Sequence, residues 1–361
     1  MRKGLCRPEL RILTLSATLE DIALRAGLSV STVSRILNNI AGKHRISKET
    51  EKRVLKAAAD LKYRPNQLAR GLRLKKTQTI GLILPDISNP FFAYVTRSIQ
   101  SEVHKQGYSL VVCDTDEDLV LEVEHTNLLI GKGVDGLIVM PVGQRAEHLE
   151  RLSKEGIPYV LVDRCFDDIK TSSVVVDNYR GSYDAVEFLI KHGHKRIGII
   201  QGLPNTFTTK GRLQGYLDAL TAHHLPIDFE LIVGHSFRKE TGYVETKFLL
   251  SKTDRPTAIF ATGDLLTLGA LQAIYESGLT IPDDVSLVAF DEIDFNAFLR
   301  CPLTTVWQPK ENMGELAVKL LVEAIKTKGR REPKQIVLSP RLVPGGSVKR
   351  IPAQITLAVT Q

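Results

Sequence analysis

Cysteine is scarce in this 361-residue chain, and none of its four cysteines belongs to a Cys-x-x-Cys motif or to a Cys/His spacing typical of metal ligands. We therefore expect reduced thiols, no bound metal and no other cofactor. Long apolar runs are also lacking: no stretch is long enough to cross a bilayer, and Arg11 interrupts the leucine-containing leader before it could form a signal-peptide core. These absences predict a cytoplasmic protein without a membrane partner.

Catalytic patterns are missing as well. The sequence shows no nucleophile–base pair, metal-ligand spacing or phosphate-binding loop. Residues 131–136 fit G-x-G-x-x-G by letter, but they follow a predicted helix and precede a predicted strand, which is the reverse of the dinucleotide-binding order. We interpret them as a helix-ending turn. The sequence thus predicts no catalytic residues and no enzymatic activity.

Positive charge is concentrated in the N-terminal part of the chain. Residues 1–76 hold 18 Lys and Arg against 6 Asp and Glu, whereas the rest holds 30 against 35. Such local basicity suits a phosphate-binding head on a body that has no affinity for DNA. With 43% hydrophobic residues, a chain of this length can form more than one domain.

Two short helices are predicted next to each other in this basic region. In residues 19–26 apolar side chains recur with helical spacing, and Gly27 can end this helix. Ser29 can cap a second helix over residues 30–38, whose apolar residues share a face that can pack on the first helix. Two short helices around a glycine-bearing turn form the helix-turn-helix pattern.

The other face of the second helix carries Ser31, Thr32, Ser34 and Arg35. Short hydroxyl groups and one guanidinium group can donate to phosphates and to base edges in the major groove. Val30 lies at the edge of the apolar face, and core packing or contact with a thymine methyl group fits it equally well. The alternative for the whole face is an ordinary solvated surface.

The segments DIALRAGLSVSTVSRILNN and YRPNQLARGLR resemble the lactose/galactose-repressor family of bacterial transcription regulators. This resemblance extends from about Thr18 to about Arg350. It implies a head over residues 18–63 whose second helix enters the major groove of operator DNA. Ser47 is expected to cap a third helix that closes the head's core. Its core residues are expected to be Val54, Leu55, Ala58 and Leu61.

Residues 64–77 are predicted to form a conditional hinge helix and linker. Pro65 suits a first helical turn, but Gly71 costs roughly 1 kcal/mol relative to alanine, and so short a helix is marginal in water. The resemblance implies that it folds when two copies meet on DNA, with Leu72 wedged into the minor groove. The alternative is a flexible linker. The expected DNA contacts are Thr18, Val30, Ser31, Thr32, Ser34, Arg35, Asn38, Asn66, Ala69, Arg70 and Leu72.

From Thr79 onward the pattern changes to alternating strands and helices. Continuous apolar strands with helical crossovers predict parallel sheets covered on both faces. The resemblance implies an α/β core over residues 78–350, periplasmic-binding-protein-like, with two doubly wound subdomains and chain crossings near residues 178, 308 and 338. The predicted strands are Ile80–Leu84, Leu110–Cys113, Gly136–Met140, Tyr159–Val162, Ile197–Ile200, Ala258–Ala261 and Val285–Phe290.

Ligands of such sheets bind beyond the carboxyl ends of the strands. Carboxylates, arginines and aromatic residues follow several of the predicted strands here, a set that can hold a polyhydroxylated ring. The resemblance implies that Phe91, Asp163, Arg212, Phe237 and Asp291 line the cleft, whereas Asp264 on its own better fits helix capping. The expected effector-binding residues are Asp86, Asn89, Phe91, Phe92, Asp163, Arg164, Thr208, Arg212, Phe237, Asp264 and Asp291.

The chemical class of the effector stays open at this point. The body resembles the purine repressors of the family, but Arg164 and Thr206 replace a tryptophan and an arginine of those proteins, which disfavours a purine. Arg164 and Arg212 leave room for an acidic or phosphorylated sugar, and a neutral sugar fits as well. A purine-type corepressor is the alternative. In a different class, the chain would be a sugar-binding protein without a DNA function.

These patterns together predict a sequence-specific transcriptional regulator, a repressor, that binds a palindromic operator in double-stranded DNA as a homodimer. A small-molecule effector, sugar-like in chemistry, is expected to control it allosterically. Residues 351–361 form a tail without leucine heptads, so we expect a dimer rather than a tetramer. Residues 1–17 are expected to be a disordered N-terminal extension.

Overall fold

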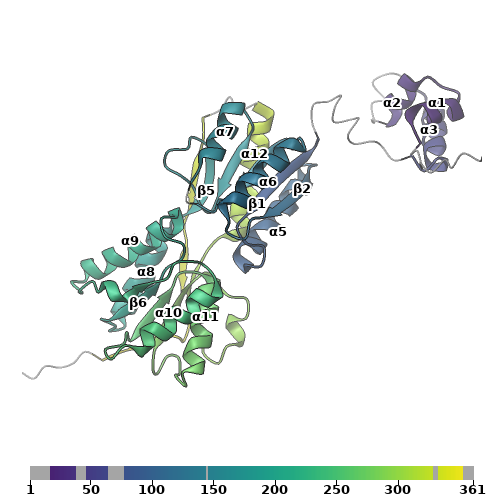
Figure 1. The fold of residues 1–361 in the computed structure, drawn as a ribbon. Coiled ribbons are helices and arrows are strands. Elements are labelled where there is room, and N and C mark those ends of the chain that lie inside the picture. Colours follow the sequence, from purple (N-terminus) through teal and green to yellow (C-terminus); the bar gives the residue numbers. More distant parts are fainter. Residues whose placement is uncertain (1–16, 38–45, 64–76, 144, 328–331, 353–361) are drawn as a thin grey trace, which may run out of the picture. The chain divides into compact units, whose positions relative to one another are not determined.

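The computed structural model describes residues 17–37, 46–63, 77–143, 145–327 and 332–352 (Figure 1). The chain divides after Lys75 into two compact units, called here the head and the core. Almost all of the predicted N-terminal extension, hinge helix and tail lies outside the described residues.

The head is a bundle of three short helices, α1 (Leu19–Ala26), α2 (Val30–Leu37) and α3 (Lys48–Asp60). Thr18 begins α1 in a capping box with Asp21, and Gly27 ends it with a left-handed φ of 62°. Ser29 and Ser47 cap α2 and α3, each accepting a hydrogen bond from the amide three residues on. The buried core consists of Ile22, Ala23, Ala26, Val33, Ile36, Val54 and Ala57.

One predicted core residue of the head lies on its surface. The side chain of Leu55 is 50% exposed. Helix α3 instead buries Val54 and Ala57, which are three residues apart and therefore on one face, while Ala58 and Leu61 are partly buried. The prediction for Leu55 was wrong because this short helix buries only a narrow stripe.

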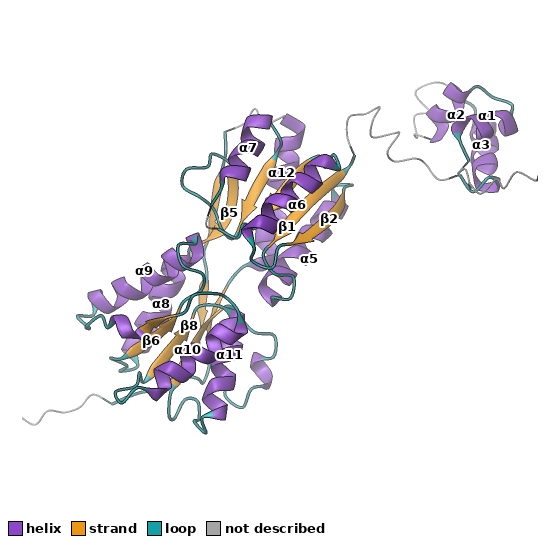
Figure 2. Ribbon diagram, in the orientation of Figure 1, coloured by secondary structure: helices purple, strands orange, loops and turns teal. Residues whose placement is uncertain are grey.

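The first subdomain of the core is a six-stranded parallel sheet in the order β11-β5-β4-β3-β1-β2 (Figure 2). Its strands are β1 (Thr79–Leu84), β2 (Ser109–Asp114), β3 (Gly136–Val139), β4 (Tyr159–Val162), β5 (Ser172–Val176) and β11 (Gln335–Leu338). Helices α5 (Pro90–Lys105) and α12 (Lys310–Thr327) cover one face. Helices α6 (Leu119–Gly131) and α7 (Glu147–Glu155) cover the other. Both faces of the inner strands β1, β3, β4 and β5 are thus buried, which explains their apolar residues, whereas the edge strands β2 and β11 are partly exposed.

The second subdomain repeats this plan in the order β12-β10-β9-β8-β6-β7, with only β12 antiparallel to its neighbour. Its strands are β6 (Ile197–Ile200), β7 (Ile232–Val233), β8 (Ala258–Ala261), β9 (Ser286–Phe290), β10 (Thr304–Trp307) and β12 (Arg341–Val343). Helices α8 (Asn178–Lys191) and α9 (Phe207–Ala222) pack on one face. Helices α10 (Lys239–Ser251) and α11 (Asp264–Glu276) pack on the other.

The chain passes between the two sheets three times, and these passages set the geometry of the cleft. They lie between β5 and α8, between β10 and α12, and between β11 and β12. Figure 1 shows the three segments side by side where the two subdomains meet. The carboxyl ends of strands from both sheets are thereby brought to one region of the core.

All seven predicted strands are present, and the predicted fold class is confirmed. Sequence reasoning missed β5, β7, β10, β11 and β12 among the described residues. Strand β7 has only two residues, and β11 alternates exposed and half-buried positions instead of forming an apolar run. Strands β5 and β10 each begin with two hydroxyl residues. Strand β5 does contain three buried valines, Val174 to Val176, and this apolar run was overlooked.

Candidate functional site

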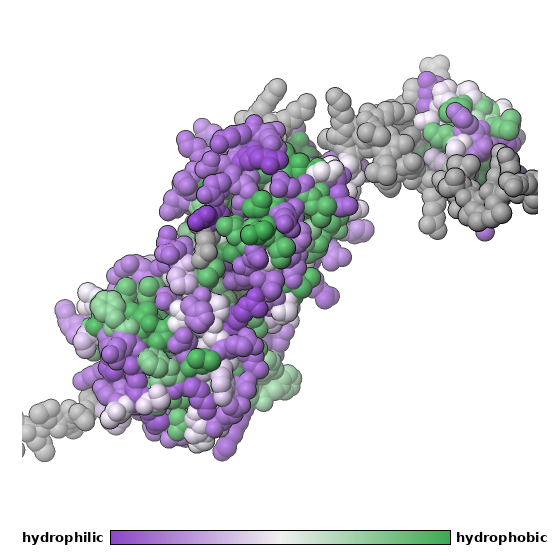
Figure 3. Space-filling model, in the orientation of Figure 1, coloured by the Kyte–Doolittle hydropathy of each residue, from purple (hydrophilic) through white to green (hydrophobic). Residues whose placement is uncertain are grey.

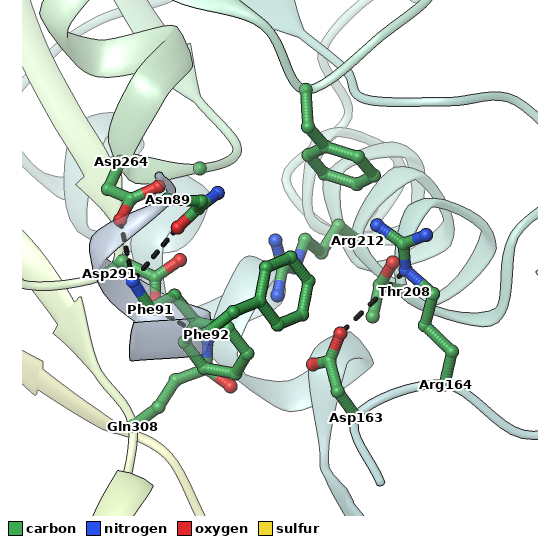
Figure 4. Close-up of a pocket in the computed structure, with 12 residues that line it drawn as sticks. Asn89, Phe91, Phe92, Asp163, Arg164, Thr208, Arg212, Asp264, Asp291 and Gln308 are labelled. Atoms are coloured by element: carbon green, nitrogen blue, oxygen red, sulfur yellow. Dashed lines mark hydrogen bonds and ion pairs between the residues drawn. The ribbon is translucent and has the colours of Figure 1, made fainter. Parts of the chain in front are cut away.

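A small cavity lies where the strand ends of the two subdomains meet (Figure 4). Both sheets contribute side chains, as expected for ligand sites at the carboxyl ends of strands. The lining residues are Asn89, Phe91, Phe92, Asp163, Arg164, Thr208, Arg212, Phe237, Gly263, Asp264, Asp291 and Gln308.

Ten of the eleven side chains expected at the cleft line this cavity, and Asp86 does not. The Asp86 carboxylate accepts hydrogen bonds from the amide and the hydroxyl of Ser88, at 2.7 and 2.6 Å. It therefore stabilises the turn that leads from β1 to α5. Sequence reasoning missed Gln308, because that residue follows β10, a strand that was not predicted.

Arg212 is buried in the cavity wall and held by two protein acceptors. Its Nε donates to Asn178 Oδ1 at 2.8 Å, and one terminal nitrogen donates to the carbonyl of Thr262 at 2.7 Å. Its guanidinium carbon lies 3.8 Å from the centroid of the Phe290 ring. Burial lowers the pKa of Arg212, while Asp291 and Asp163 act to raise it. The cation is thus fixed in position by contacts from three separate strands or helices.

Arg164 is also buried, and both of its terminal nitrogens are engaged. One donates to the carbonyls of Pro141 and Val142, at 3.2 and 2.7 Å, and the other donates to the Glu117 carboxylate at 2.9 Å. The guanidinium carbon lies 5.9 and 5.0 Å from the ring centroids of Phe92 and Phe237. Arg164 therefore lies within about 6 Å of two aromatic rings of the cavity.

Asp163 and Asp291 follow β4 and β9 directly, and both have left-handed φ angles, of 67° and 79°. This backbone conformation is costly for residues other than glycine, and such costs concentrate at functional sites. Asp291 accepts a hydrogen bond from the Gln308 amide at 2.6 Å. Burial raises the pKa of Asp163 to about 6, although Arg164 and Arg212 act against the shift.

We predict that Asp163→Asn stabilises the ligand-free protein more at pH 7 than at pH 5. The pKa of Asp163 rises from 3.8 to about 6 on folding, so the folded protein binds this proton more tightly. The associated stabilisation is complete below about pH 4 and is lost as the pH rises through 6. The stability difference between variant and wild type should therefore be about 1 kcal/mol larger at pH 7. Denaturant titrations at both pH values measure it, and an unchanged difference contradicts the shift.

Asp264 joins the two subdomains and also accepts a hydrogen bond in the first turn of its own helix, although it does not hold the N-cap position. It is the first residue of α11, where Gly263 holds the cap position. One carboxylate oxygen accepts a hydrogen bond from the Leu265 amide at 2.8 Å, and the other accepts one from the Phe91 amide of α5 at 3.2 Å. Burial and the nearby Asp291 raise the pKa of Asp264 to about 6. The capping prediction for Asp264 was therefore wrong.

Three buried polar atoms in this region lack a hydrogen-bond partner: Asp163 Oδ1, Gln308 Oε1 and Arg164 Nε, of which Nε lies 3.8 Å from Asp163 Oδ2. Two of them are acceptors and one is a donor. Buried polar atoms are normally paired with protein groups, water or a ligand, so unpaired ones at a cavity wall are open to a bound molecule. A ligand with hydroxyl groups can donate to the two acceptors.

Helix α2 presents the predicted DNA-reading residues on the surface of the head. Ser31 and Arg35 are exposed, and Thr32 and Ser34 are partly buried. Val30 is 41% exposed, so its side chain is available for contact. Thr18 belongs to the cap of α1, where it exchanges hydrogen bonds with Asp21. The remaining expected DNA contacts lie outside the described residues, namely Asn38, Asn66, Ala69, Arg70 and Leu72.

Two properties of the described residues bear on function. No helix among them is long and apolar enough to cross a membrane. No group of three or more His, Cys, Asp and Glu side chains is placed to hold a metal ion within these ranges.

A helix-turn-helix head joined to a two-sheet core with a polar cavity defines a ligand-binding transcription regulator. Residues 18–66 match bacterial regulatory proteins of the lacI family, and residues 186–348 match a periplasmic binding protein-like domain. The HTH-type transcriptional repressor PurR of Pasteurella multocida (strain Pm70) is 36% identical over 92% of this chain and 99% of its own length. The chain belongs to the lacI family of bacterial regulatory proteins.

Solved structures agree with this assignment. The Lac repressor dimer bound to operator and the anti-inducer ONPF matches with a TM-score of 0.81 and 25% identity, over 92% of this chain and 99% of that one. A LacI family transcriptional regulator from Enterococcus faecium with bound ribose matches with a TM-score of 0.69 and 29% identity, over 76% and 100%. The resemblance read from the sequence is confirmed, and the chain is a DNA-binding transcription regulator rather than an enzyme.

Proposed function

We propose that this protein is a cytoplasmic transcriptional repressor whose operator binding is controlled by a neutral monosaccharide bound in the cavity between the two subdomains. The main observation that supports this proposal is a pair of buried acceptors without a hydrogen-bond partner, Asp163 Oδ1 and Gln308 Oε1. Sugar hydroxyl groups can donate to both and accept from Arg164 Nε, and phenylalanine rings suit the apolar faces of a sugar. The ribose bound to the Enterococcus faecium regulator supports this class and makes D-ribose the first probe.

An acidic or phosphorylated sugar fits the cavity less well. Three carboxylates line it against two guanidinium groups. Both terminal nitrogens of Arg164 already donate to protein acceptors, so they are not available as a fork for a phosphate. An anionic ligand would therefore meet an excess of negative charge in this lining.

A purine is the second candidate, and the similarity to the repressor named PurR favours it. A flat purine base binds best where it can stack on the faces of aromatic side chains. Here the guanidinium group of Arg164 lies 5.9 and 5.0 Å from the ring centroids of Phe92 and Phe237, so it would compete with a base for these rings. The cavity therefore supports a sugar better than a purine.

We propose that the repressor acts as a homodimer on a palindromic operator. Strand β2 is an edge strand, and it exposes Val111 and Val112 by 36% and 37%. Helix α6 exposes Val120 and Leu128 beside it, and Figure 3 shows apolar residues gathered on this face of the core. An exposed apolar patch on a sheet edge favours an interface, and a second copy of the chain supplies a matching patch.

We expect Arg35→Ala to weaken operator binding about 10- to 100-fold, because an exposed arginine on a recognition helix contributes roughly 1–3 kcal/mol to base or phosphate contacts. Arg25→Ala is the matched control, since Arg25 lies on α1 and pairs with Asp60 at 3.2 Å. Fluorescence anisotropy on a duplex selected from random DNA by the wild-type protein measures both. Equal losses in the two variants would show that α2 is not the reading helix.

A further inference from the structure

Glu122 is a fully buried carboxylate of α6 that does not line the cavity. One of its oxygens accepts a hydrogen bond from the Val142 amide at 2.5 Å, and the other lies 2.7 Å from His148 Nε2 of α7. Burying a carboxylate is costly unless its contacts compensate. An apolar residue at this position would pack against the sheet equally well. The glutamate differs from it by its two polar contacts, with the Val142 amide and with His148.

The loop held by Glu122 also holds Arg164. The carbonyls of Pro141 and Val142 accept from one terminal nitrogen of Arg164. Gly143, with a φ of 96°, lets the loop approach closely: a Cβ there would lie 3.2 Å from Arg164 Cδ and 3.3 Å from Thr206 Cγ2 of the second subdomain. Residues 141–143 thus connect Glu122 to an arginine of the cavity and to the facing subdomain.

We propose that Glu122, oriented by His148, is a positioning residue for effector binding. It fixes the Val142 amide, and the loop carbonyls then fix the Arg164 guanidinium beside Asp163, Phe92 and Phe237 in the cavity wall. This inference rests on the proposed function, because it takes the cavity as the effector site. It assigns a role in ligand affinity to a pair of side chains outside the cavity.

The first test labels the arginines of the ligand-free, full-length protein with phenylglyoxal. Mass spectrometry then identifies which arginines have reacted. In Glu122→Leu we expect Arg164 to react at least about fivefold faster. The variant loses the hydrogen bond from the Val142 amide to the Glu122 carboxylate, so residues 141–143, which hold Arg164, become less firmly fixed. Arg212 should stay protected, since it is held by Asn178 and Thr262 in the other subdomain. Unchanged labelling of Arg164, or equal gains at both arginines, would overturn the proposal.

The second test is calorimetric titration with D-ribose. Glu122→Leu should bind about tenfold more weakly, whereas Glu122→Gln should stay within about threefold of wild type because its carbonyl still accepts from Val142. In an Arg164→Ala background, adding Glu122→Leu should change affinity less than twofold.

Glu187→Leu is the matched control, because Glu187 also pairs with a histidine, His223, but lies on α8 outside the cavity lining. Additive losses contradict the positioning role. If wild type does not bind D-ribose, that probe fails and the labelling result alone decides the inference.

Discussion

We expect Arg212→Ala to lower the affinity of the core for its sugar effector about 100-fold or more, with operator binding by the ligand-free protein retained. Truncating one partner of a buried charged cluster costs roughly 2–5 kcal/mol, since the opposing charges stay buried. Here Asp163 and Asp291 would lose the nearby cation that acts on both. The separate head explains why DNA binding should persist.

The matched control for this variant is Arg180→Ala. Arg180 lies on α8, is largely exposed and pairs with Asp184 at 2.8 Å. Calorimetric titration of wild type and both variants with D-ribose gives the affinities, and anisotropy with operator DNA gives the second readout. Wild-type sugar affinity in Arg212→Ala would remove Arg212 from the site and with it the charge argument.

We expect Val33→Asp to abolish operator binding while the core keeps its sugar affinity and its own melting transition. Val33 is fully buried between the head helices, among Ile22, Ile36 and Val54. An aspartate there would place an unpaired charge in a small apolar core, which costs several kcal/mol, and so small a domain has little stability to lose. The head should therefore unfold alone.

Leu24→Asp is the control for this experiment, because Leu24 lies on α1 and is 87% exposed. It should leave the head folded and DNA binding within about threefold of wild type. Differential scanning calorimetry, together with the DNA and sugar titrations, distinguishes the outcomes. Loss of sugar binding in Val33→Asp would show that the two units do not fold independently.

Much of the cleft could be predicted because one rule of parallel sheets ties sequence position to space. Apolar runs such as Tyr159–Val162 mark buried strands, and polar residues directly after them, such as Asp163, must lie at the carboxyl edge of the sheet. The same rule failed for Gln308, since the preceding strand begins with threonines and has no apolar run. The rule finds a site residue only where the strand before that residue has been recognised.

What could not be predicted depends on partners distant in the chain. Asp264 reads as a helix cap locally, but its carboxylate meets the Phe91 amide from another subdomain, 173 residues away. Arg164 reads as a cation available to an anionic ligand, yet Glu117 and two loop carbonyls occupy its terminal nitrogens. Local sequence shows which groups are present, whereas tertiary packing decides which of their hydrogen bonds remain for a ligand.

The most direct measurement of the central claim is a thermal-shift screen of the full-length protein against neutral monosaccharides, sugar acids, sugar phosphates and purines. A ligand that binds the native state raises its melting temperature, by an amount that grows with its concentration relative to Kd. The proposed function predicts a saturable rise with a neutral monosaccharide, with D-ribose tested first, and no such rise in Arg212→Ala. A rise only with purines or only with phosphorylated sugars would contradict it.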